Sequence, residues 1–100
     1  MRTPGSATTP AVRRLGPVEL DYAVETLRNH GFHEHDHAAG RAVLKKPGAR
    51  FSPRAHQRPF EAVLSSGQDG LELELRYDMF VAFDTGDLDE QADRLARALA

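Results

Sequence analysis

The chain contains no cysteine among its 100 residues. Disulfide bonds, thiolate metal sites and thiol nucleophiles are therefore excluded. Redox chemistry does not indicate the compartment, although the lack of disulfides fits a cytoplasmic protein, which is the location that we expect.

Long apolar runs are lacking as well. The longest is Met79–Phe83, which has five residues, whereas a membrane-spanning helix needs about 20, so no membrane span is expected. The first ten residues carry no apolar core of the kind found in signal peptides, and proline, glycine, serine and threonine predominate there. We expect residues 1–10 to form a disordered leader and residues 11–100 to form a single domain.

The net charge is only −2, but the charges are separated along the chain. Residues 41–59 carry six basic side chains and no acid, and the three prolines within 47–59 predict a long basic loop there. Residues 61–100 carry ten acids against three arginines. This separation favours electrostatic complementarity within the fold or between copies. Binding of an anion or a nucleic acid by residues 41–59 is an alternative, although the whole chain lacks the basic excess of a dedicated nucleic-acid-binding domain.

An alternating pattern begins at Leu71, where every second residue as far as Phe83 is apolar and the residues at 72, 74, 76 and 78 are charged. This period of two predicts a strand with one apolar face. Because the preceding segment 67–70 is typical of a tight turn, we expect the segments 60–66 and 71–77 to form a hairpin. Two further strands are predicted at 32–37 and 41–46, and residues 11–15 offer another short strand in front of them.

Two amphipathic helices flank the predicted strands. The first is expected from about Pro17 to His30, and Gly31 provides a residue that can adopt the left-handed conformation that ends a helix. The second begins near Asp87 and has an apolar stripe formed by Leu88, Ala92, Leu95 and Leu99.

These elements predict an α+β fold of two layers. A four-stranded antiparallel meander sheet would carry the N-terminal and the C-terminal helix on one face, because a sheet with one apolar face needs a cover. The outline resembles helix-grip architectures, in which a sheet carries one or two helices, and that resemblance concerns the fold alone.

The run Val81–Gly86 resembles the hydrophobic-hydrophobic-Asp-Thr-Gly signature of aspartic proteases, which would make Asp84 half of a catalytic carboxylate pair. That family places the motif early and follows it with a flap and further strands. Here only 14 residues follow Gly86, and they are typical of a helix. Since Asp, Thr and Gly also favour a turn between a strand and a helix, we interpret the run as a turn and expect no enzymatic activity.

Three histidines, His33, His35 and His37, alternate with Glu34 and Asp36. On a regular strand the three imidazoles would share one face, and zinc accepts three histidine ligands. The run approaches the His-x-His-x-Asp-His pattern of metallo-β-lactamases without matching it. Metal binding by these histidines is therefore an alternative hypothesis beside that of a solvent-facing strand.

The alternation also predicts which side chains face away from the helices. We interpret this outer face as a contact surface with an apolar centre and a charged margin. The residues predicted to bind a partner are Val43, Val63, Phe80 and Lys45 on the sheet and Arg50 and Arg54 in the basic loop. The leading prediction is a small non-enzymatic binding domain without a cofactor, whose partner is another protein or a second copy in a homodimer.

Overall fold

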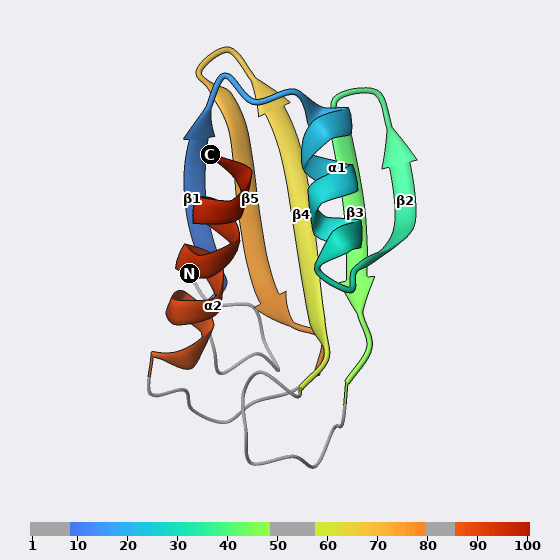
Figure 1. The fold of residues 1–100 in the computed structure, drawn as a ribbon, viewed down its shortest axis with the longest axis vertical. Coiled ribbons are helices and arrows are strands. Elements are labelled where there is room, and N and C mark those ends of the chain that lie inside the picture. The colour runs from blue at the N-terminus through green and yellow to red at the C-terminus, as the bar shows by residue number, and fades with distance from the viewer. Residues whose placement is uncertain (1–8, 49–57, 80–85) are drawn as a thin grey trace.

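The computed structural model describes residues 9–48, 58–79 and 86–100. The elements in chain order are strand β1 (Ala11–Gly16), helix α1 (Leu20–Asn29), strands β2 (His33–Ala38), β3 (Arg41–Lys46), β4 (Phe60–Gly67) and β5 (Gly70–Tyr77), and helix α2 (Asp87–Leu99). The strands form one antiparallel sheet in the order β1-β5-β4-β3-β2, and both helices lie on the same face of it (Figure 1). The fold is therefore α+β, as predicted.

The sheet has five strands, whereas four were predicted. Strands β2 to β5 form the expected meander, in which each strand pairs with the next one along the chain. The additional strand β1 pairs antiparallel with β5, with Ala11 opposite Leu75 and Arg13 opposite Leu73. The start of the domain thus lies beside its fifth strand and covers the edge that β5 would otherwise expose.

Helix α1 is shorter than predicted at its start and ends where expected. Glu19 has extended backbone angles (φ −69°, ψ 136°), so the first helical residue is Leu20 and not Pro17. At the other end Gly31 has φ 92° and donates to the carbonyl of Arg28, while Phe32 donates to the carbonyl of Leu27 at 3.0 Å. This pair of bonds is a Schellman cap, for which glycine supplies the left-handed residue without steric cost.

The hydrophobic core lies between the sheet and the two helices. The side chains that were predicted to face the helices are buried there, including those of Ala42, Leu44, Phe60, Ala62, Leu64, Leu71, Leu73, Leu75 and Tyr77. Phe60 and Tyr77 are directly opposite in the β4–β5 pair, and their rings stack with centroids 5.3 Å apart. Full burial of one such leucine stabilises a fold by about 1.5–3 kcal/mol, so this layer holds the domain together.

One arginine connects helix α2 to the edge strand β1. Arg13 donates from Nε to Asp93 at 2.7 Å and from Nη2 to Asp89 at 3.1 Å. The hydrogen bond to Asp93, followed by that to Asp89, raises the pKa of the Arg13 guanidinium above its ordinary value. The C-terminal helix is thereby attached to the first strand of the domain.

Parts of two predicted segments lie outside the described residues, namely positions 1–8 of the expected leader and 49–57 of the expected basic loop. Within the described part of the chain, no helix combines the length and the apolar character that crossing a membrane requires.

Candidate interaction surface

The face of the sheet that is turned away from both helices is built from the alternate residues of β1, β3, β4 and β5. We call it the helix-free face and define it by Val12, Arg14, Arg41, Val43, Lys45, Glu61, Val63, Ser65, Glu72, Glu74 and Arg76. Directly opposite residues on antiparallel strands share a face. The central row of this face therefore runs Val12, Glu74, Val63, Val43 across four strands.

The apolar centre of the helix-free face is small. Val43 and Val63 are directly opposite each other, and they are only 9% and 6% exposed. Val12 is 45% exposed and extends the row toward the β1 edge. Val43 and Val63 thus lie on the face to which the alternation assigned them. Phe80 lies outside the described residues.

Lys45 and Arg76 of the helix-free face form a connected group with Glu61 and with Asp78, which follows β5. Arg76 donates from Nε to Glu61 at 2.6 Å, and the Nζ of Lys45 lies 3.7 Å from the same carboxylate and 3.6 Å from Asp78. Glu61 is 15% exposed, the least of the four side chains. Lys45 was predicted to contact a partner, and it forms ion pairs within its own chain.

The other two basic residues assigned to partner binding, Arg50 and Arg54, lie outside the described residues. The same holds for Asp84 and Thr85 of the run that resembles the protease signature. Gly86 has φ 95° and directly precedes helix α2, which begins at Asp87 as predicted.

The three histidines of β2 do not share a face, contrary to the expectation from their spacing. The register between β2 and β3 shifts between Glu34 and Asp36, so that His33 is opposite Lys45 and His37 is opposite Ala42. Lys45 belongs to the helix-free face, whereas Ala42 is part of the core under the helices. A bulge of this kind inserts one extra residue, which reverses the facing of all residues beyond it.

The bulge places His37 beside Glu34 on the helix-covered side. The Nδ1 atom of His37 and the Oε2 atom of Glu34 form a short hydrogen bond, and Arg28 of helix α1 lies 3.9 Å from the other carboxylate oxygen. Among residues 9–48, 58–79 and 86–100, no three histidine or acidic side chains are placed so that they could hold a metal ion.

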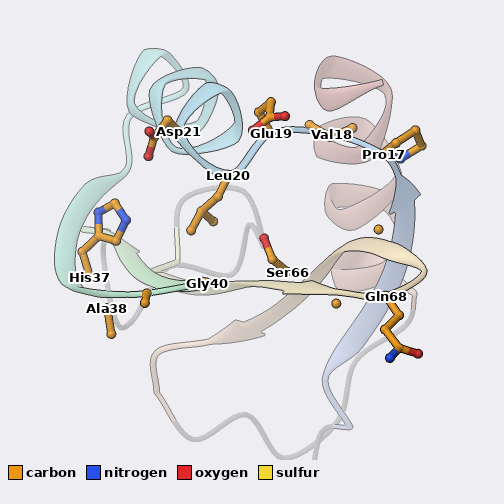
Figure 2. Close-up of a pocket in the computed structure, with 13 residues that line it drawn as sticks. Pro17, Val18, Glu19, Leu20, Asp21, His37, Ala38, Gly40, Ser66 and Gln68 are labelled. Carbon is orange, nitrogen blue, oxygen red and sulfur yellow. The ribbon is translucent and has the colours of Figure 1, made fainter.

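A polar cleft of about 560 Å³ lies at one end of the sheet (Figure 2). Its walls come from the β1–α1 connection and the first turn of α1, from the β2–β3 turn, and from the β4–β5 turn. The side chains of His37 and Ser66 enter it from different sides, with that of Leu20 between them in this view. Glu19 and Asp21 add two carboxylates, and no lysine or arginine is among the lining residues.

Two glycines determine the shape of the sheet at this end. Gly70 has φ 112°, and a Cβ atom at this position would lie 2.2 Å from the carbonyl oxygen of Gly16. Only glycine therefore allows the β4–β5 turn to approach the end of β1 so closely. The sequence did not predict this cleft, because its walls come from three connections that are far apart in the chain. The glycines in those connections are the sequence feature that marks them as turns.

A serine nucleophile needs a histidine nitrogen within hydrogen-bonding reach, and the bond between Nδ1 of His37 and Glu34 leaves Nε2 available for that role. In Figure 2, however, the side chain of Leu20 lies between those of His37 and Ser66. Comparison with protein-family models, curated proteins and solved structures finds no match to this chain.

Proposed function

We propose that this chain is a small non-enzymatic protein-interaction domain, and that a second copy of the chain docks on its helix-free face. The observation that carries the proposal is the asymmetry of the sheet. One face buries the core under α1 and α2, whereas neither helix covers the other (Figure 1). A cytoplasmic location belongs to the same proposal, and the cysteine-free sequence supports it.

The distribution of charge favours a second copy over an acidic or a basic partner. Four cationic side chains of the helix-free face, Arg14, Arg41, Lys45 and Arg76, alternate with the carboxylates of Glu61, Glu72 and Glu74. A surface with both signs interspersed is complementary to itself after rotation about a twofold axis. Val12, with 45% of its surface exposed, supplies most of the apolar surface of the contact, and the nearly buried Val43–Val63 pair lies at its centre.

The decisive variant is Val63→Lys. Lysine is chosen because Glu74 lies directly opposite Val63, so the new charge has a partner in the free monomer and its long stem can reach water. In the dimer the same charge would lie at the centre of the contact. We expect the variant to keep the circular dichroism spectrum of the wild type and to lose the association between helix-free faces.

Two further variants make the experiment independent of Val63. Val12→Lys changes an exposed residue of the same row and should weaken the same association without affecting the fold, while Tyr22→Lys is the matched control on the outside of α1, where Tyr22 is 55% exposed. Light scattering at matched concentrations measures the mass of each. If Val63→Lys and Val12→Lys remain folded and associate as tightly as Tyr22→Lys, the helix-free face is not the contact.

A further inference from the structure

Within the described part of the chain, strand β2 is an open edge of the sheet. It is the last strand in the order β1-β5-β4-β3-β2, all six of its residues are exposed, and no described element lies beyond it in Figure 1. An edge strand presents unpaired backbone N–H and C=O groups, which another strand can extend. Charged side chains and bulges usually discourage such pairing, and β2 has both, so a partner must fit them.

The β2 bulge changes which residues of this strand share a face. Glu34 is opposite Leu44 and His37 is opposite Ala42, and both of these β3 residues belong to the core. Glu34 and His37 therefore lie on the helix-covered side although they are three positions apart, and their hydrogen bond depends on this. In a regular strand, residues three apart point to opposite faces.

Which residues share a face determines how β2 can pair with β2 of a second copy. Opposite residues in an antiparallel pair must share a face, so a regular strand of this sequence would bring acid opposite acid and histidine opposite histidine. With matched bulges facing each other across a twofold axis, Glu34 instead lies opposite His37 of the second copy, and His37 lies opposite Glu34 of the second copy. His33 and Ala38, which both lie on the other side, are then opposite each other as well.

We propose that β2 pairs antiparallel with β2 of a second copy, with the twofold axis between His35 and Asp36, so that two five-stranded sheets form one continuous sheet. Backbone hydrogen bonds supply the association, and the two Glu34–His37 contacts select the register. Arg28 lies 3.9 Å from Glu34, so each of the two Glu34 carboxylates near the axis has a guanidinium group of its own chain beside it. The contact is independent of the one proposed for the helix-free face.

A charge exchange between two variants tests this register. Glu34→Lys places lysine opposite histidine, and His37→Glu places glutamate opposite glutamate, so each variant alone should associate through β2 at least about tenfold more weakly than the wild type. In an equimolar mixture each changed residue meets a complementary residue of the other variant, so association should return. Asp69→Lys, an acid on the β4–β5 turn that is 88% exposed, is the matched control.

The measurement is sedimentation equilibrium, with circular dichroism as the folding control. It is made in the Val63→Lys background, so that only the edge contact remains. The proposal stands if both single variants are monomeric, the mixture forms a heterodimer and the Asp69→Lys control remains a dimer. It is overturned if the single variants associate as tightly as the control, or if the mixture stays monomeric.

The two proposed contacts fail in different ways. If the helix-free face associates and the edge does not, Val63→Lys is monomeric and Glu34→Lys is a dimer. If only the edge associates, Glu34→Lys is monomeric and Val63→Lys is a dimer.

Discussion

At the scale of single residues, the two faces of β5 place Leu73 and Glu74 in opposite environments. Leu73 is fully buried under the helices, whereas Glu74 lies on the helix-free face with Arg76 at 3.8 Å. Leu73→Asp would bury a carboxylate without a partner and should lower the free energy of unfolding by more than about 3 kcal/mol. Glu74→Gln should change it by less than about 0.5 kcal/mol. Thermal melts of the two variants measure the difference, and equal losses would mean that the faces are assigned wrongly.

Single residues also show how far the facing of strand side chains could be predicted from the sequence. The facing of Leu71, Leu73 and Leu75 follows from alternation alone. Alternate residues of a strand point to one of only two faces of the sheet, and the apolar set occupies the buried face. The facing of His33 and His37 was predicted wrongly from the same rule. The bulge at His35 changes the period, and it exists only through the pairing of β2 with β3.

At the scale of elements, the attachment of helix α2 to strand β1 depends on Arg13. Its guanidinium bonds to Asp89 and Asp93, and its side chain is 26% exposed. Arg13→Gln should lower stability by about 1 kcal/mol, because it removes charge-assisted hydrogen bonds that are only partly screened. Arg14→Gln is the neighbouring control, since Arg14 is 76% exposed and its nearest carboxylate, Asp69, is 3.9 Å away. Urea denaturation of both variants tests this, and a loss as large for Arg14→Gln would contradict it.

The junction between the β4–β5 turn and the end of β1 depends on Gly70. Gly70→Ala would combine a left-handed backbone with a methyl group 2.2 Å from the Gly16 carbonyl oxygen, and neither backbone can yield as a flexible side chain would. We expect a loss of roughly 2–5 kcal/mol. Gly67→Ala, whose methyl group would meet only an ordinary contact at 3.7 Å, should stay within about 1 kcal/mol of the wild type. Comparable melting temperatures for the two variants would refute the close approach.

At the scale of the whole molecule, the opposite charges of the two halves of the sequence meet inside the fold. Lys45 from the basic segment pairs with Glu61 and Asp78 from the acidic part of the chain. The separation of charge therefore serves the fold itself at this point, and the remaining exposed charges are available to the proposed contacts. If both contacts form, the wild type has a mass greater than that of a dimer at high concentration, whereas the double variant Val63→Lys with Glu34→Lys is monomeric.

The sequence by itself determined the elements whose signals are local. These signals are the alternation in β5, the apolar stripe in α2 and the glycine that ends α1. Each depends on residues that are close together in sequence, so the elements and their buried faces follow directly. The α+β class then follows from the need to cover one apolar face of the sheet.

Only the tertiary structure decided the features that join distant segments. The pairing of β1 with β5, the bulge in β2, the contact of Gly70 with Gly16 and the ion pairs around Glu61 all involve residues far apart in sequence or a register set by a neighbouring strand. A local pattern does not state which strand lies beside which, because many pairings satisfy the same alternation. The packing of the whole chain selects one of them, and with it the surface on which function is proposed.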